Sequence, residues 1–413
     1  MSEKAKEPVI RFKGFSGEWE ERKLNDVAEF CKGRGYSKGD LVESGTPIIL
    51  YGRLYTKYET NISEVDTYVE AKEGALYSKG GEVIVPASGE TAEDIARAAT
   101  VEKTGILLGG DLNVVMPNED INSAFLAISI SNGKSQRELA KKAQGKSIVH
   151  IHNEEIRNLI VPFPNKEEQQ KIGSYFRQLD RLITLYQRKY NKLTSVKKSM
   201  LQKMFPASGQ TVPALRFAGF TDKWEVRKIS ELGKIYIGLV TTMTAHYTDE
   251  GTLLIRNSDI KDGRFEFKEN PIFLEQSFAK ANESRMHQIG DVITVHTGDV
   301  GTSAVITKNE DKSIGFATIV TRPNKAIISS DYLCSFLNTE QHKRWAVAIS
   351  TGDGRTNYNL GDYYDLVVPV PSFVEQQKIA EFINKLNHLI ALHQQELQKL
   401  QNLKKACLKK MFV

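Results

Sequence analysis

The sequence of 413 residues lacks several features that would assign it to a particular class of protein. It has only three cysteines, Cys31, Cys334 and Cys407, which lie far apart and form no Cys-x-x-Cys pair. This pattern supports neither a disulfide framework nor a zinc site. No apolar run approaches the roughly 18 to 20 residues that span a membrane, and the N-terminus has no hydrophobic signal core. We therefore expect a cytoplasmic protein with no membrane association.

Catalytic and cofactor-binding motifs are missing as well. No Gly-x-Gly-x-x-Gly opens a βαβ unit and no Gly-x-x-x-x-Gly-Lys-Ser/Thr loop occurs, which argues against a dinucleotide site and a nucleotide motor. The pair Asn357-Tyr358 lacks the Asn/Asp-Pro-Pro-Tyr arrangement associated with adenine methyltransferases. His150 and His152 share a strand face but have no third ligand nearby, so a metal site is not favoured. We expect no catalytic residue, and no cofactor or metal ion bound by this chain.

Charge is present but unevenly distributed. With 40% hydrophobic and 26% charged residues, the composition is typical of a globular protein, and the net charge is only +5. Lysine and arginine are concentrated in residues 166–205 and 373–413, so that the remainder of the chain is slightly acidic. Such a basic segment is either a solvated helix face or a surface for a polyanion or an acidic partner.

Several short motifs occur twice, in the same order. Arg-Phe-Lys-Gly-Phe at 11–15 returns as Arg-Phe-Ala-Gly-Phe at 216–220. Glu-Gln-Gln-Lys-Ile occupies both 168–172 and 375–379, each time after Pro-x-Pro and before a lysine-rich segment that ends in Lys-Met-Phe. Between these motifs lie two inserts that share a frame but little sequence. Similar scaffolds with different inserts indicate a protein that presents two recognition surfaces in one fixed geometry.

The two lysine-rich segments are predicted to be long helices. Each carries apolar residues in alternating steps of four and three, which is the heptad pattern of a coiled coil. The seam positions are Ile172, Phe176, Leu179 and Ile183 in the first helix and Ile379, Ile383, Leu386 and Ile390 in the second. A pseudo-twofold repeat would make the helices antiparallel partners within one chain. Lys197 and Lys404 interrupt the seams at matching places, either as a polar register pin or as snorkelling side chains.

Both inserts are predicted to be α+β, because short apolar segments alternate with small polar loops. The expected elements are strands at 46–51 and 81–85 in the first insert, strands at 252–257 and 290–294 in the second, and helices at 121–132 and 330–350. The second strand of each insert runs into a polar loop, at 88–91 and 297–301 respectively.

The order of these parts resembles the specificity (S) subunit of a type I restriction-modification system. In that family a variable domain, Pro-x-Pro, Glu-Gln-Gln-Lys-Ile and a long helix all occur twice. Residues 352–360, Gly-Asp-Gly-Arg-Thr-Asn-Tyr-Asn-Leu, resemble the turn that these domains carry before the second Pro-x-Pro. The first half departs from this pattern, with Gly-Lys-Ser-Ile-Val-His at 145–150. The resemblance covers essentially the whole chain.

The resemblance implies an α+β fold with a pseudo-twofold internal repeat. Two α/β target-recognition domains would be separated by two long helices that pack as an antiparallel coiled coil. The implied segments are target-recognition domain 1 at 1–165, a central conserved helix at 166–205, a linker with target-recognition domain 2 at 206–372, and a distal conserved helix at 373–413.

The resemblance also implies a non-catalytic function. Each recognition domain would recognise one half of a bipartite target in double-stranded DNA, while the helices dock two methyltransferase subunits. Those subunits use S-adenosylmethionine to methylate adenine at N6. Up to two restriction subunits, which are translocating nucleases that use ATP and Mg, would complete the complex.

Candidate DNA-binding residues follow from the chemistry of base and phosphate recognition. Arginine can bind guanine through two hydrogen bonds and asparagine can bind adenine in the same way, while lysine and hydroxyl groups bind phosphate. The candidates in the first half are Arg34, Tyr36, Lys38, Tyr51, Arg53, Lys57, Ser88, Thr91 and Lys146. Those in the second half are Arg256, Asn257, Thr297, Arg355, Asn357 and Tyr358. Alternatively, the tyrosines pack beneath sheets and the arginines pair with neighbouring carboxylates.

Two other classes of function stay open at this point. A stand-alone DNA methyltransferase or nuclease would need a cofactor or metal motif that the sequence lacks, and binding of S-adenosylmethionine by the isolated chain would reveal one. A coiled-coil spacer carrying two protein-binding domains would not retain duplex DNA in a filter-binding test with methyltransferase subunits present.

Overall fold

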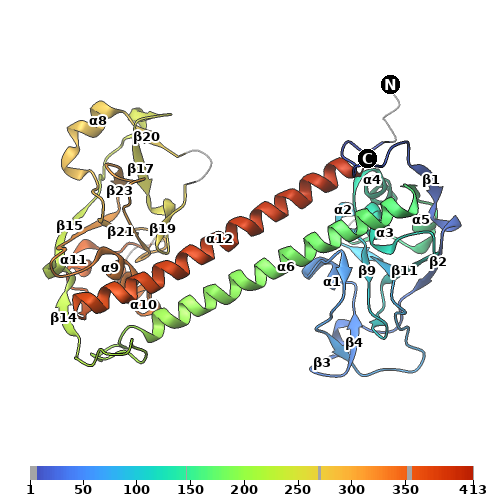
Figure 1. Ribbon diagram of the computed structural model, residues 1–413, viewed down its shortest axis with the longest axis horizontal. Coiled ribbons are helices and arrows are strands. Elements are labelled where there is room, and N and C mark those ends of the chain that lie inside the picture. The colour runs from blue at the N-terminus through green and yellow to red at the C-terminus, as the bar shows by residue number, and fades with distance from the viewer. Residues whose placement is uncertain (1–6, 146, 268–270, 351–355, 413) are drawn as a thin grey trace. The chain divides into compact units, whose positions relative to one another are not determined.

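The computed structural model describes residues 7–145, 147–267, 271–350 and 356–412. The chain forms two compact units, whose helices and strands are labelled in Figure 1. Unit 1 consists of Met1–Gln187 together with Gln395–Val413, and unit 2 consists of Arg188–Gln394. The predicted division gave each long helix a segment of its own, whereas each compact unit contains part of both helices.

Unit 1 contains two small sheets. The first has the strand order β2 (Ala28–Lys32), β11 (Leu112–Pro117), β7 (Glu82–Pro86), β9 (Ala99–Val101) and β5 (Asn61–Ile62). The second has the order β10 (Leu107–Leu108), β4 (Thr46–Ile49), β6 (Tyr68–Val69) and β3 (Leu41–Val42). Every residue of β7 is buried, because both faces of this central strand are covered. The strands predicted at 46–51 and 81–85 therefore form, with slightly different ends.

Helices and two-stranded ribbons complete unit 1. The helices are α1 (Arg53–Thr56), α2 (Ala92–Ile95), α3 (Ser123–Ile130), α4 (Gly133–Lys142) and α5 (Asn153–Arg157). The ribbons are β1 (Glu20–Lys23) with β13 (Ile160–Phe163), and β8 (Ser88–Gly89) with β12 (Val149–His150). Helix α3 lies against β7 and β9, and almost all of its residues are buried. It begins where Asn122 Oδ1 accepts a hydrogen bond from the backbone of Phe125.

The two main sheets of unit 2 repeat the strand order of those in unit 1, except that in the described part of the chain its first sheet has four strands where that of unit 1 has five. The first runs β15 (Gly233–Ile237), β24 (Ile319–Pro323), β21 (Val292–Thr294) and β22 (Ser303–Val305). The second runs β23 (Ile314–Phe316), β17 (Thr252–Arg256), β20 (Phe273–Leu274) and β16 (Tyr247–Thr248). In each second sheet the first two strands are parallel and the others antiparallel. The two inserts thus share one fold despite their different sequences.

The remaining elements of unit 2 follow the pattern of unit 1 only in part. They are α7 (Ile229–Leu232), α8 (Gln276–Ala281), α9 (Ser330–Leu337), α10 (Glu340–Ile349), α11 (Leu360–Tyr364), the ribbon β14 (Glu225–Lys228) with β25 (Val367–Val370), and the hairpin β18 (Ile260–Lys261) with β19 (Arg264–Phe265). Short 3-10 helices lie at Leu24–Asp26, Lys38–Asp40, Thr244–His246, Asn257–Asp259 and Glu283–Arg285.

The single helix predicted at 330–350 is divided in the structure. The side chain of Thr339 accepts a hydrogen bond from the backbone of His342 and so begins α10. Asn338 points the other way, because its amide donates to Ser303 O and accepts from Ser303 N on β22. A helix cap and a contact with the sheet therefore break the helix where an apolar pattern alone indicates continuity.

The two long helices are α6 (Lys166–Lys203) and α12 (Phe373–Met411). Each begins two residues after a proline, which lacks the N–H group that a helix interior requires. Within unit 1, Tyr175 of α6 contacts Cys407 of α12, and Asp180 pairs with Lys404, so these two segments run in opposite directions. The predicted coiled coil beyond such contacts stays a prediction. In the described part of the chain, no helix is long and apolar enough to cross a membrane.

The predicted seam residues are buried or partly buried, but several of them belong to the domain cores. Ile172, Phe176 and Leu179 lie in the core of unit 1, and Ile183 packs against it. Ile379 and Ile383 lie in the core of unit 2, while Leu386 and Ile390 are also buried. Each core is completed by the Met-Phe end of the other helix, at 411–412 in unit 1 and 204–205 in unit 2. The repeated Lys-Met-Phe motif is therefore an anchor within each core.

The repeated motifs near the two ends of each scaffold contact each other. Arg11 donates to both carboxylate oxygens of buried Glu168, and Arg216 donates in the same way to buried Glu375. The lysine of each Glu-Gln-Gln-Lys motif lies 5.0 Å from the ring centre of the second phenylalanine in Arg-Phe-x-Gly-Phe. These pairs are a feature that the sequence signals only through the recurrence of an arginine and a glutamate at matching places in both scaffolds.

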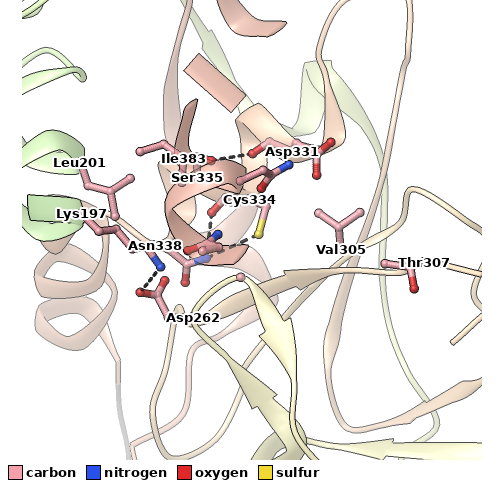
Figure 2. A pocket seen from close by; sticks show the side chains of 13 residues that line it. Lys197, Leu201, Asp262, Val305, Thr307, Asp331, Cys334, Ser335, Asn338 and Ile383 are labelled. Carbon is pink, nitrogen blue, oxygen red and sulfur yellow. Dashed lines mark hydrogen bonds and ion pairs between the residues drawn. The ribbon is translucent and has the colours of Figure 1, made fainter. Parts of the chain in front are cut away.

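The lysines that interrupt the seams are paired with aspartates. In unit 2, Lys197 Nζ lies 2.9 Å from Asp262 Oδ2 beside a cavity of about 200 Å³ (Figure 2). In unit 1, Lys404 Nζ contacts Asp180 and lies 3.4 Å from Thr60 Oγ1. Both lysine side chains are largely buried, so the polar pairing is favoured over snorkelling at a frayed helix end.

Candidate nucleic-acid interface

The ribbon β8–β12 brings candidate residues of unit 1 together. Ser88 Oγ lies 3.0 Å from His150 Nδ1, and the backbone carbonyl of Ser88 accepts a hydrogen bond from Tyr55 Oη at 2.7 Å. The exposed ring of Tyr51 meets Tyr55 edge to face, with ring centres 6.4 Å apart. We call Tyr51, Tyr55, Ser88 and His150 the unit 1 surface. Its hydroxyl, imidazole and phenol groups offer both hydrogen bonds and aromatic faces to a ligand.

Basic side chains lie next to the unit 1 surface. The ring of His152 is stacked on that of His150, with centres 6.4 Å apart, and Lys32 Nζ lies 3.5 Å from His152 Nδ1. All three of these side chains are exposed. Among the described residues, no group of three or more His, Cys, Asp or Glu could hold a metal ion. Positive and aromatic groups beside a polar ribbon suit the phosphates and bases of DNA.

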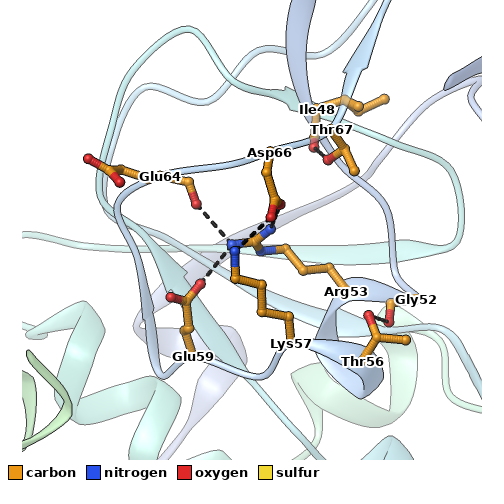
Figure 3. Close-up of polar contacts among 9 residues, drawn as sticks. All are labelled: Ile48, Gly52, Arg53, Thr56, Lys57, Glu59, Glu64, Asp66 and Thr67. Carbon is orange, nitrogen blue, oxygen red and sulfur yellow. Dashed lines mark hydrogen bonds and ion pairs between the residues drawn. The ribbon is translucent and has the colours of Figure 1, made fainter. Parts of the chain in front are cut away.

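Arg53 does not lie on this surface, which corrects the prediction that it binds DNA. Its guanidinium donates to Asp66 and Glu59 at 2.7 Å and to the carbonyl of Glu64 at 2.9 Å (Figure 3). Lys57 Nζ also pairs with Asp66, and both cations lower the pKa of that carboxyl to about 2, Lys57 more than Arg53. The side chain of Arg53 is only 7% exposed, so its guanidinium lies among these three partners rather than at a surface that a base edge could reach.

Other candidates of the first half have local roles. Tyr36 is buried in an apolar cluster, and its hydroxyl accepts a hydrogen bond from the backbone of Lys72, which corrects its assignment to DNA. Thr91 caps α2 through a hydrogen bond from Asp94 N. Arg34 and Lys38 are exposed, so both keep access to a ligand. Lys146 lies outside the residues that the structure describes.

In unit 2 three candidate residues meet around one histidine. Asn257 Oδ1 accepts a hydrogen bond from the backbone of His296 at 2.8 Å, and its amide nitrogen donates to Ala317 O at 3.1 Å. Thr297 Oγ1 donates to Asn357 Oδ1 at 2.8 Å and lies 2.8 Å from His296 Nδ1. We call Asn257, His296, Thr297 and Asn357 the unit 2 surface. Partial burial lowers the pKa of His296, so this surface favours its neutral form.

The remaining candidates of the second half are placed differently. Tyr358 is buried in the core of unit 2, where its hydroxyl lies 3.1 Å from His342 Nε2, so its assignment to DNA is corrected. Arg256 donates through Nε and Nη2 to Asp259, which fixes the guanidinium and leaves its Nη1 side for another acceptor. Arg355 lies outside the described residues. His150 and His296 were missed as surface residues. Only the folded chain brings His150 beside Ser88, whereas the position of His296 directly before Thr297 was a usable signal.

The fold and the two surfaces define a protein with two recognition units that have one framework and different surface chemistry. The family profile described as "Type I restriction modification DNA specificity domain" matches residues 16–195 and again 221–402. The chain therefore belongs to the type I restriction-modification DNA specificity family, as its sequence resemblance predicted. Members of this family are specificity subunits rather than catalytic subunits, and that is the nature of this chain.

Individual relatives match over nearly the whole chain. The type I restriction enzyme MjaVIII specificity subunit of Methanocaldococcus jannaschii is 20% identical over 399 residues, which cover 94% of this chain and 90% of that protein. The fold is similar to the type I S subunit of M. genitalium, with a TM-score of 0.67, 15% identity, and coverage of 98% and 99%. A chain from a structure of type I R-M complex assembly gives a TM-score of 0.51 at 17% identity, covering 95% and 97%.

Proposed function

We propose that unit 1 and unit 2 recognise the two halves of one bipartite target in double-stranded DNA. The observation that supports this most directly is the difference in chemistry between corresponding positions of one framework. Tyr51 lies three residues after Ile48, the first residue of β4 that pairs with β10, and Asn257 lies three residues after Leu254, the first residue of β17 that pairs with β23. Two equivalent positions that carry an aromatic ring and an amide suit two different base sequences.

The chemistry of the two surfaces suits recognition of base edges supported by phosphate contacts. In the major groove an asparagine amide matches the donor and acceptor of adenine, whereas lysine and hydroxyl groups bind phosphates irrespective of sequence. Unit 2 carries amides and hydroxyls at its surface, while unit 1 carries aromatic and basic groups. Distinct chemistry of this kind would give each half-site its own sequence.

The long helices would dock two methyltransferase subunits, which supply S-adenosylmethionine for adenine methylation. Leu182 and Leu185 of α6 are 43% and 45% exposed, and Leu389 and Leu392 of α12 are 42% and 43% exposed. Each pair lies the same number of residues after its Glu-Gln-Gln-Lys motif. Two matching apolar patches on a repeated scaffold fit two copies of one partner. Up to two nuclease subunits with ATP and Mg would join this core.

Exchange of one insert tests the assignment of half-sites. Residues 25–160 are replaced by the corresponding segment of another family member, and the variant is expressed with its methyltransferase subunit. Methylated adenines in host DNA are then mapped by single-molecule sequencing. We expect one half of the methylated target to change and the other half to stay. Changes in both halves, or in neither, would contradict the assignment of one unit to one half-site.

Substitution of the leucine pairs tests docking. Leu182→Asp/Leu185→Asp and Leu389→Asp/Leu392→Asp should each remove one of two methyltransferase subunits, because a carboxylate cannot be buried against an apolar partner without a large desolvation cost. Light scattering of the purified complex gives its mass. Leu403→Asp is the control, since Leu403 is also an exposed leucine of α12 but Val196, at the matching place in α6, is not exposed. Unchanged mass in both double variants would refute the docking surface.

A further inference from the structure

The two units contain one polar pair at the same place in the fold. In unit 1, His150 of β12 pairs with Ser88 of β8, and the backbone of Ile151 donates to Ala87 O. In unit 2, Asn357 forms an isolated bridge with Thr297, and the backbone of Tyr358 donates to His296 O. The identical backbone pattern makes His150 the structural counterpart of Asn357. It likewise makes Ser88 the counterpart of Thr297.

The side chains of these residues are paired as well as the backbones. Ser88 Oγ lies 3.0 Å from His150 Nδ1, and Thr297 Oγ1 donates to Asn357 Oδ1 at 2.8 Å. A hydroxyl thus holds the variable residue in both units, although the partner is an imidazole in one and an amide in the other. His150 is exposed and Asn357 half-buried, so a ligand can reach both. The hydroxyl contact is the same in both units, whereas the residue that it holds differs. A position that recognises different bases in the two half-sites requires this combination.

We propose that His150 and Asn357 each select one base pair, His150 in the half-site of unit 1 and Asn357 in that of unit 2. Ser88 and Thr297 are the positioning residues that orient them. This inference rests on the proposed recognition of DNA by the two units. It adds His150, which the sequence suggested only as half of an unlikely metal site, and it assigns the two residues one common role.

The hydroxyl contacts restrict which bases each residue can select. Thr297 occupies one lone pair of Asn357 Oδ1, and the amide keeps a second lone pair and its N–H donors, which is the combination that matches adenine. The Ser88 contact at Nδ1 directs Nε2 of His150 to the opposite side of the ring. If Ser88 donates, Nε2 carries the proton and suits the acceptors of guanine. If Nδ1 donates, Nε2 accepts and suits an amino group of adenine or cytosine.

Reciprocal substitutions in the full chain test the proposal. The target of the wild-type chain, assembled with methyltransferase subunits, is first mapped by methylation sequencing. Competition binding is then measured with duplexes that carry every single base substitution in either half. His150→Asn should change the preferred base at one position of the unit 1 half-site, with discrimination at that position altered about tenfold. Asn357→His should do the same in the unit 2 half-site only.

Two further variants separate base selection from a structural role. Ser88→Ala should reduce discrimination at the position that His150→Asn changes, because it removes the hydroxyl that orients the ring. Lys141→Ala is the control, since this exposed lysine pairs with Glu138 on α4 rather than with a residue of the unit 1 surface. We expect it to leave base preference unchanged.

Three results would overturn the inference while leaving the proposed function intact. The first is an unchanged target in both His150→Asn and Asn357→His. The second is a uniform loss of affinity for all duplexes without a change in base preference, which is the effect of a structural residue. The third is a change in base preference with Lys141→Ala equal to that with His150→Asn. Absence of any bipartite methylated target in the wild-type complex would instead refute the proposed function.

Discussion

Unit 1 and unit 2 share one framework but bury different kinds of side chain. Both bury hydroxyl groups, such as Thr100 in unit 1 and Thr294 in unit 2, but among the described residues only unit 2 buries histidines, His287 and His342. Thr294 and Ser303 pair through their hydroxyls inside unit 2, and His287 lies 2.8 Å from Ser313 Oγ. The comparison teaches that one framework tolerates buried imidazoles in one of its two copies, where a hydroxyl or a carbonyl group contacts each ring.

The surfaces differ in a corresponding way. The described histidines of unit 1, His150 and His152, are exposed beside Lys32 and an aromatic pair, whereas unit 2 places His296 among amides and hydroxyls. The arginine–glutamate pairs of the scaffold do not differ, because they have the same geometry in both units. The two units thus keep this scaffold contact while their surfaces differ.

Acidification should produce the largest difference between the units. Burial lowers the pKa of His287 and of His342 to about 4 from 6.5, so unfolded unit 2 binds more protons than folded unit 2 below pH 6.5. The stability of unit 2 should therefore fall as the pH decreases from about 6.5 to about 4, by roughly 3 kcal/mol for each histidine. Urea unfolding at a series of pH values, followed by a hydrogen-exchange pulse at one fixed pH, would measure the free energy of unfolding of each unit separately. Greater acid sensitivity of unit 1 would contradict this expectation.

Removal of the phenylalanine side chains at the helix ends should give the second largest difference in stability between the two units. Phe412 packs against Trp19, Phe125 and Phe176 in unit 1, and Phe205 packs against Trp224 and Tyr332 in unit 2. We expect Phe412→Ala to destabilise unit 1 and Phe205→Ala to destabilise unit 2, each by about 3 to 5 kcal/mol through a core cavity.

Peptide-resolved hydrogen exchange would assign these effects. Leu403→Ala is a suitable control, because this exposed side chain leaves no buried cavity when it is shortened. Loss of protection in unit 2 alone after Phe412→Ala would show that the end of α12 does not anchor unit 1.

The arginine–glutamate pairs should give a smaller and equal effect in the two units. Arg11→Ala leaves buried Glu168 without its bidentate partner, and Arg216→Ala does the same to Glu375. We expect a loss of about 3 kcal/mol in each case, at the low end for a broken buried pair because the arginines are partly accessible to water. Arg11→Ala/Glu168→Gln should recover part of this loss. Thermal unfolding of the single and double variants would test it, and equal stability of all of them would exclude an energetic role for the pair.

Neutralisation of Lys38 should have the smallest effect and should not alter sequence preference. Because an exposed lysine on phosphate contributes through counterion release, Lys38→Ala should reduce the slope of log affinity against log salt by about 0.9. Asn357→Ala should leave that slope unchanged and reduce discrimination at one base position. Salt titrations with the mapped target and a scrambled duplex would compare the two. A base-specific effect of Lys38→Ala would show that this lysine contacts a base rather than a phosphate.

The sequence predicted the elements better than it predicted the surface. Long heptad segments after Pro-x-Pro gave both helices, and short apolar segments gave the strands at 46–49 and 252–256. The interleaved tyrosines and arginines were less informative, because the same residue types serve a core and a DNA surface. Tyr36 is buried whereas Tyr51 is exposed, and Arg53 is enclosed by carboxylates whereas Arg34 is exposed.

The sequence by itself determined the repeat, the two helices and the family, because periodicity and motif order are local properties of the chain. Only the tertiary structure decided that Ser88 meets His150 as Thr297 meets Asn357, and that Phe412 and Phe205 complete the cores of the two units. Those contacts join residues that lie far apart in sequence. They depend on strand pairing and burial, which arise from the packing of the whole unit rather than from any short segment.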